Sequence, residues 1–150
     1  DHKDLRLQEF SKRIKNYDVI ALQEMFGSFS NRRETLIQLA AAEGFKYVTL
    51  LAYLTFSTKL TTHNLHTFRY AVTAPRPPCC VFVDGGLVIL SKLPIVACDW
   101  LRYPRGTLAG GDALAEKGAL YCMIEAETKT GQKVYFHLVN THLQASYQVR

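Results

Sequence analysis

The residues best suited to chemistry in this sequence are Asn140, Thr141 and His142, which follow a run of β-type residues. A histidine there lies at the end of a buried strand, where α/β proteins commonly hold ligands. Because imidazole titrates near neutral pH, it can hydrogen-bond a phosphate or transfer a proton. The alternative is a structural histidine whose ring is satisfied by the backbone at the strand end.

Glu24 is the second candidate, because it ends an apolar run that begins at Asp18. A carboxylate at the end of a buried strand is costly unless it is paired or binds a cation. Mg²⁺ takes oxygen ligands and often uses only one or two carboxylates together with substrate phosphate. The alternative interpretation of Glu24 is a helix cap or a surface ion pair just past the strand.

A third segment places Asp112 and Lys117 just before a predicted strand. A lysine near phosphate acts as a point charge, and an aspartate beside it could orient it. The alternative is a solvated loop whose charges contribute at most ~1 kcal/mol. Gly85 and Gly86 precede another apolar strand, where glycine permits close backbone approach or a positive φ. A plain turn into a core strand is the alternative there.

Hydrophobic periodicity predicts the elements that would position these residues. Asn31 and Glu34 resemble a capping box before a helix, and Gly44 is a plausible helix end. The predicted helices are 4–15 and 32–43, and the predicted strands are 18–24, 45–55, 85–91, 95–101, 118–126 and 133–140. We expect the last two strands to form a hairpin and 85–91 to pair with 95–101 through a turn at 92–94. Residues 57–80 are predicted to be a long loop with a short strand near 68–72, and 106–111 to be flexible.

Composition bounds the class of protein. The 150 residues are 48% hydrophobic, which suits one folded domain and excludes a disordered chain. The net charge of +5 favours anionic partners such as phosphodiesters, nucleic acid or an acidic membrane face, although a mildly basic surface without a specific partner is the alternative. The adjacent Cys79 and Cys80 lack zinc-site spacing, and Cys98 and Cys122 are predicted to be small buried hydrophobes.

Targeting signals are not evident, so localisation stays open. No apolar run reaches the ~18–20 residues that span a bilayer, and no signal peptide is visible. The sequence lacks an initiator Met and starts inside a predicted helix, so we expect a piece of a larger protein. Residues 50–54 could form a lipid-facing patch, but their β-type composition favours a core strand.

In combination, these motifs resemble the endonuclease/exonuclease/phosphatase superfamily, with its deoxyribonuclease-I-like fold. Residues 18–24 look like its second-strand motif, residues 86–92 like its central strand, and Thr141-His142 like its phosphate-contacting histidine. The segment from Asp112 to Leu120 and the Thr141-His142-Leu143-Gln144-Ala145 signature are most similar to neutral sphingomyelinases.

The resemblance implies an α/β (α+β) fold, a four-layer α/β/β/α sandwich of which residues 1–150 form about the first half. It also implies Mg²⁺, with Mn²⁺ as a substitute, as the cofactor held by Glu24. His142 would contact phosphate and Asn140 would bind substrate. Asp112 would engage Lys117 as a switch. The family's other metal ligands and its general base lie in motifs that these residues do not contain.

The implied function is Mg²⁺-dependent hydrolysis of sphingomyelin to ceramide and phosphocholine, with contact to a membrane surface. One alternative is a metal-dependent nuclease or other phosphoesterase of the same fold. Nucleic acid is the less favoured substrate, because no basic groove with stacking aromatics is evident. The other alternative is a catalytically incomplete fragment that serves as a binding scaffold.

Overall fold

A computed structural model describes residues 2–26, 30–50, 84–104 and 115–143, without the side chains of 47–50. The helical elements are α1 (His2–Arg13), a 3-10 turn (Ile14–Asn16) and α2 (Arg32–Ala42). The strands are β1 (Val19–Leu22), β2 (Tyr47–Leu50), β3 (Val88–Ser91), β4 (Ile95–Arg102), β5 (Gly118–Glu127) and β6 (Lys133–His142).

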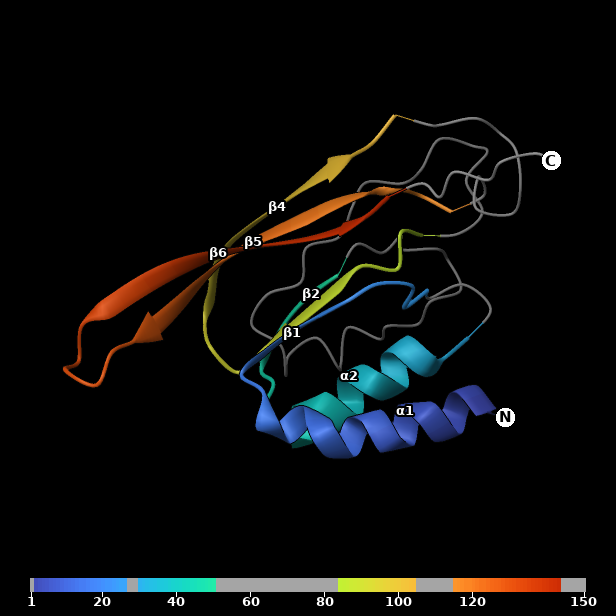
Figure 1. Ribbon diagram of the computed structural model, residues 1–150, viewed down its shortest axis with the longest axis horizontal. Coiled ribbons are helices and arrows are strands. Elements are labelled where there is room, and N and C mark those ends of the chain that lie inside the picture. Colours follow the sequence, from blue (N-terminus) through green and yellow to red (C-terminus); the bar gives the residue numbers. More distant parts are fainter. Residues whose placement is uncertain (1, 27–29, 51–83, 105–114, 144–150) are drawn as a thin grey trace.

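The first sheet has the order β1-β3-β2 and is antiparallel throughout. Its central strand β3 is apolar over Val88–Leu90 and buried along its whole length, as expected for a strand covered on both faces. Helices α1 and α2 lie across one face of this sheet (Figure 1). Ile14, Leu36 and Phe45 pack there against Val88 and Leu90.

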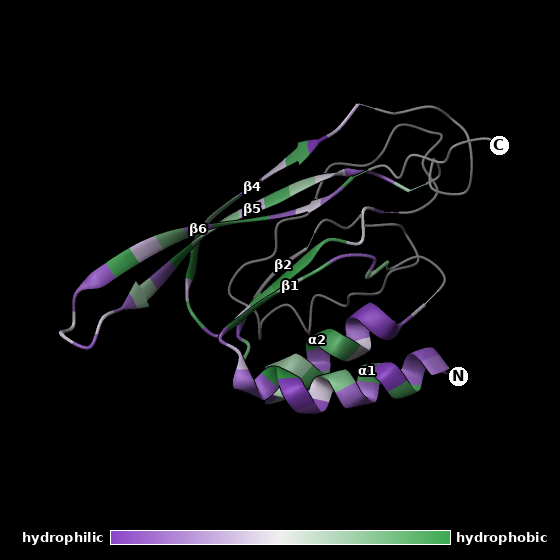
Figure 2. Cartoon of the chain, viewed as in Figure 1, coloured by the Kyte–Doolittle hydropathy of each residue, from purple (hydrophilic) through white to green (hydrophobic). Residues whose placement is uncertain are grey.

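The second sheet has the order β4-β5-β6, and its long hairpin β5–β6 pairs from Gly118↔His142 to Glu127↔Lys133. Leu87 and Ile89 face this sheet and form a second core with Leu120, Cys122 and Ile124. Successive residues along β3 therefore serve two cores, because side chains of a strand alternate between its faces. In Figure 2 the central strands are largely hydrophobic, whereas the helices carry many hydrophilic residues.

The expected pairing of 85–91 with 95–101 is wrong. The strands β3 and β4 follow one another in the chain but belong to different sheets. The Ser91 hydroxyl accepts from the Leu93 amide at 3.0 Å and donates to the Leu93 carbonyl at 2.7 Å. This tight bend at Lys92–Pro94 turns the chain out of the first sheet, and the Glu125 amide then bonds the Pro94 carbonyl at 2.9 Å.

The predicted capping box at α2 is also absent. Asn31 precedes the helix but has φ −90° and ψ 9°, and its side chain makes no capping hydrogen bond. The Ser30 hydroxyl accepts from the Arg32 amide at 3.2 Å instead. The other end of the helix follows the prediction, because Gly44 has φ +89° and its amide bonds the Ala41 carbonyl at 3.1 Å.

The predicted fold class is confirmed by this arrangement. Three layers, helices on a sheet on a second sheet, are present in the described part of the chain (Figure 1). Residues 51–54, the loop predicted at 57–80 and the segment predicted to be flexible at 106–111 lie outside the described residues. Cys122 is buried and Cys98 is partly buried, and their two sulfur atoms lie 3.9 Å apart. Among the described helices, none has the length and apolar character to cross a bilayer.

Candidate functional site

Glu24 lies just past the end of β1 in an unusual backbone conformation. Its φ of +59° makes it the one residue other than glycine with a positive φ in the described part of the chain. Such a conformation costs on the order of 1 kcal/mol or more for a residue with a Cβ, and it is concentrated at functional sites. The Glu24 side chain is 70% exposed, so its carboxylate is free to meet a ligand.

Gly86 explains how the chain holds Glu24 in this conformation. The amide of Met25 donates to the Gly86 carbonyl at 2.9 Å. Gly86 itself has φ +60°, and a Cβ there would lie 2.9 Å from the Met25 nitrogen and 3.0 Å from the Glu24 Cα. The sequence predicted close backbone approach or a positive φ at the glycine pair. Gly86 shows both features.

A buried ion pair between Arg33 and Asp84 supports the backbone turn at Gly86. One Asp84 oxygen accepts from the Gly86 amide at 2.9 Å, and the other accepts from Arg33 Nη1 at 2.9 Å. Arg33 and Asp84 are 3% and 4% exposed. Arg33 comes from the first turn of α2, so this helix supports the backbone beside Glu24. Sequence reasoning missed the pair, because nothing local marks Arg33 as an inward-facing residue.

His142 ends β6 and meets both other candidate residues. Its Nε2 lies 3.2 Å from Lys117 Nζ and 3.7 Å from Glu24 Oε1. The Lys117 ammonium can only donate, so Nε2 accepts in this contact, whereas a hydrogen bond from Nε2 to a phosphate oxygen requires Nε2 to carry a proton. The His142 side chain is 15% exposed, and the Phe26 ring lies beside it with centroids 6.5 Å apart.

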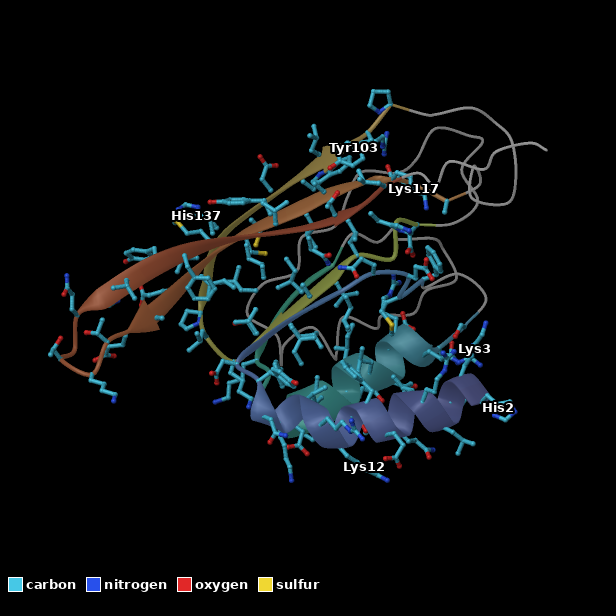
Figure 3. All side chains as sticks on the ribbon, in the orientation of Figure 1. His2, Lys3, Lys12, Tyr103, Lys117 and His137 are labelled. Carbon is cyan, nitrogen blue, oxygen red and sulfur yellow. The ribbon has the colours of Figure 1, made fainter. Side chains whose placement is uncertain are left out.

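Lys117 is held at the start of β5, where the second sheet ends near Tyr103 (Figure 3). It is 7% exposed, and its carbonyl accepts from the Tyr103 amide at 3.0 Å. Because Gly118 pairs with His142, the residue before Gly118 is brought beside the imidazole. The structure thus unites Glu24, Lys117 and His142 from three separate segments of the sequence.

Glu116 is a buried acid at the same end of the sheet that sequence reasoning did not single out. Its side chain is 3% exposed and forms an ion pair with Arg102 Nε. Burial raises the pKa of the Glu116 carboxyl to about 7. Arg102 also stacks over the Trp100 ring, 5.2 Å from its centroid. The sequence feature that could have indicated Glu116 is its position directly before the candidate Lys117.

Asn140 is 2% exposed and lies between the two sheets. Its Nδ2 donates to the Leu22 carbonyl at 2.8 Å and to the Val88 carbonyl at 3.1 Å, and its Oδ1 accepts from Gln23 Nε2. The amide is thus occupied by protein groups. Asp112, the remaining candidate, lies outside the described residues.

The other described histidine of β6 lies away from this cluster. His137 bonds the Tyr121 hydroxyl through Nδ1 at 2.6 Å and stacks on its ring. Figure 3 shows it far along the hairpin from Lys117. It therefore belongs to the outer surface of the second sheet.

The donor set fits part of a magnesium site. No cluster of three or more His, Cys, Asp or Glu residues that could hold a metal occurs among the described residues. Glu24 nevertheless offers an exposed carboxylate, the donor type that Mg²⁺ prefers, and this ion commonly uses few protein carboxylates. Lys117 and His142 place an ammonium and an imidazole beside the Glu24 carboxylate. A phosphate oxygen bound there would meet a cation and a hydrogen-bonding ring.

Sequence comparison relates the chain to sphingomyelinases. It is 36% identical over 140 residues to a sphingomyelinase of Dictyostelium discoideum, covering 89% of this chain and 25% of the relative. It is 28% identical over 131 residues to sphingomyelin phosphodiesterase 5 of Danio rerio, covering 85% of this chain and 20% of the relative. The chain thus spans a quarter or less of these curated relatives. No protein-family model matches it.

Structure comparison shows a shared fold. Sphingomyelinase C from Streptomyces griseocarneus matches with a TM-score of 0.66 and 24% identity, over 95% of this chain and 42% of that chain. A mutant beta toxin from Staphylococcus aureus with bound magnesium ions matches with a TM-score of 0.65 and 26% identity, over 95% and 43%. The chain is therefore a homologue of sphingomyelinases and has the deoxyribonuclease-I-like fold of the solved ones, as the motifs predicted.

Proposed function

We propose that the full-length protein is a Mg²⁺-dependent phosphodiesterase that hydrolyses sphingomyelin to ceramide and phosphocholine. The observation that carries the proposal is the convergence of Glu24, Lys117 and His142 within 3.7 Å contacts at one end of the two sheets. Two sequence relatives named for sphingomyelin cleavage support the substrate class. The magnesium ions of the beta toxin structure support the cofactor, and Mn²⁺ is the expected substitute.

Each residue has a distinct proposed role. Glu24 would hold the metal, which when bound neutralises negative charge on the phosphate. His142 would hydrogen-bond a phosphate oxygen, and Lys117 would place a positive charge on the same group. Asp112 would engage Lys117, a role that rests on the resemblance alone. The substrate-binding role predicted for Asn140 requires an amide group that the fold already occupies.

Protein burial strengthens the proposed charge interactions. Lys117 is 7% exposed, and a charge in such surroundings acts on a nearby anion more strongly than one in bulk water. The chemical change adds one water across the phosphorus–oxygen bond to ceramide, so the ceramide oxygen leaves with a proton and the phosphate stays with choline. A lipid substrate also requires the site to reach a membrane surface, which remains a prediction.

The test is an assay of the full-length protein on sphingomyelin vesicles and on DNA, with Mg²⁺ and then with EDTA. We expect cleavage of sphingomyelin that stops when EDTA removes the metal and returns with Mg²⁺ or Mn²⁺. Metal-dependent cleavage of DNA without cleavage of the lipid would establish the nuclease alternative instead. Cleavage of neither substrate would favour a scaffold that has kept the fold.

A further inference from the structure

A buried amide joins the two sheets next to the proposed site. Asn140 belongs to β6 of the second sheet, whereas its partners Leu22 and Val88 belong to β1 and β3 of the first. Both hydrogens of the amide are used on these two carbonyls, and its oxygen is used on Gln23. Leu22 and Val88 face one another in the β1–β3 register, so one side chain binds both strands of this pair at the same end.

The position of this amide in the sequence connects it to the candidate residues on both sides. Gln23 directly precedes Glu24, and Asn140 precedes His142 by two positions. Residues two apart on a strand lie on the same face, so Asn140 and His142 both project from β6 toward the first sheet. The amide is therefore a buried polar contact between the segment that carries Glu24 and the segment that carries His142.

Physical chemistry explains why a polar group is useful here. Apolar packing between the sheets, as at Ile89 and Leu120, is non-directional and tolerates small relative shifts. Hydrogen bonds require specific distances and angles, and a buried amide that loses them leaves carbonyls unsatisfied at a cost of about 1–3 kcal/mol each. A fully satisfied amide thus allows one relative placement of the two sheets at this point.

We infer that Asn140, assisted by Gln23, is a positioning residue that sets the separation of His142 from Glu24, and that it does not contact substrate. This inference rests on the proposed function and adds a new residue role to it. A displacement of about 1 Å in an active site can cost on the order of 100-fold in rate. Loss of the Asn140 hydrogen bonds to Leu22, Val88 and Gln23, here called the Asn140 clamp, should therefore reduce kcat more than it reduces substrate binding.

The experiment compares Asn140→Ala, Asn140→Asp and Gln23→Leu with the wild-type full-length protein. Asn140→Asp keeps the shape of the side chain and loses the donating nitrogen. Gln23→Leu replaces a solvent-exposed residue, so among the three variants Gln23→Leu has the lowest risk of misfolding. Ile124→Ala is the matched control, since Ile124 is 0% exposed in the same sheet and does not contact the site. For each variant we would measure kcat, KM, unfolding midpoint and Mg²⁺ affinity by calorimetry without substrate.

We expect Asn140→Ala and Asn140→Asp to lower kcat on the order of 100-fold with KM changed less than about threefold. Gln23→Leu should lower kcat in the same direction by a smaller factor, and Ile124→Ala should lower only the unfolding midpoint. Mg²⁺ affinity should be retained, because Glu24 stays anchored through the Met25–Gly86 hydrogen bond. A higher KM at unchanged kcat would show instead that Asn140 binds substrate, and a kcat equal to that of the Ile124 control would show a purely structural role.

A crystal structure of Asn140→Ala provides a readout that does not depend on activity. We expect its His142 Nε2 to Glu24 Oε1 separation to differ by on the order of 1 Å from that in a crystal structure of the wild-type protein. An unchanged separation would overturn the inference even if activity fell. If the wild-type protein does not cleave sphingomyelin, the proposed function fails, but this structural comparison still tests the clamp.

Discussion

The imidazole Nε2 of His142 lies 3.2 Å from the ammonium of Lys117, although the two residues are 25 positions apart in the sequence. The hairpin β5–β6 creates the contact, because Gly118 and His142 are paired at its open end. Neither residue could reach the other without this register. The pair presents a cation and a hydrogen-bonding ring at one point, beside the exposed Glu24 carboxylate.

Replacing Lys117 by methionine should lower kcat on sphingomyelin about 100-fold, because one charged group facing the phosphate would be lost. Stability should be unchanged or higher, since a buried ammonium is replaced by an apolar chain of similar length. Lys129→Ala, which removes an exposed charge from the hairpin turn, is the matched control and should leave kcat intact. Equal effects of the two variants would indicate a general charge effect rather than a local one.

His142→Ala should depress kcat by a factor of at least about 100, with a small effect on the free energy of unfolding. Among the described residues, its side chain contacts Lys117, Glu24 and Phe26, which lie outside the two buried hydrophobic clusters, and it remains 15% exposed. Steady-state kinetics and urea unfolding of the same preparation would check this. A large loss of stability with proportionate loss of activity would identify His142 as a structural strand-end residue.

Glu24→Gly and Glu24→Ala form a pair that separates strain from chemistry. Both remove the carboxylate, so both should abolish detectable Mg²⁺ binding in calorimetry. Because Glu24 has φ +59°, glycine relieves a strain that alanine retains, and the glycine variant should be about 1 kcal/mol more stable than the alanine variant. Retained Mg²⁺ affinity in both variants would remove Glu24 from the metal site.

Gly86→Ala should destabilise the protein more than Gly44→Ala, although both glycines have a positive φ. The added Cβ meets the Met25 backbone at position 86 but meets nothing within 4 Å at position 44. We expect about 1 kcal/mol for Gly44→Ala from backbone strain alone and about 3 kcal/mol for Gly86→Ala from strain and overlap together. Urea unfolding would measure both, and equal losses would contradict the close approach to Met25.

The raised pKa of Glu116 leads to a specific pH dependence of the free energy of unfolding. Its pKa rises from 4.5 to about 7 in the fold, so the folded state binds more protons than the unfolded state between these values. The free energy of unfolding should therefore fall as pH rises from about 4.5 to 7, by at most about 3 kcal/mol, and Arg102 offsets part of this loss. Glu116→Gln should flatten the profile in urea titrations at several pH values, whereas an unchanged slope would assign it to other groups.

Much of the local structure could be predicted from the sequence. Alternating and continuous apolar runs indicated both strands of the β5–β6 hairpin, and β1 and β3 lie inside predicted strands, because burial of one or both faces leaves a periodic trace. Glycine chemistry marked the end of α2 at Gly44, since a positive φ favours the residue without a Cβ. The capping box failed because two residues of suitable type do not fix the backbone angles that capping requires.

The residue types of the candidate site were also visible. Glu24, Lys117 and His142 each stand at the start or end of a strand-like run, where polar side chains are expected to meet ligands. Their mutual contacts were not visible, nor was the Arg33–Asp84 pair that holds the Gly86 turn. The burial of Asn140 was equally hidden, because the resemblance implied a substrate contact and nothing local indicates that protein groups occupy its amide.

The sequence by itself determined which segments become helices and strands and which residues could do chemistry. The tertiary structure decided that β3 and β4 enter different sheets, and that Asn140 joins those sheets across 117 positions to Gln23. The physical reason is that periodicity reports which face of an element is apolar and not which element covers it. Pairing and register depend on contacts between distant segments, and these exist only after the sheets have packed.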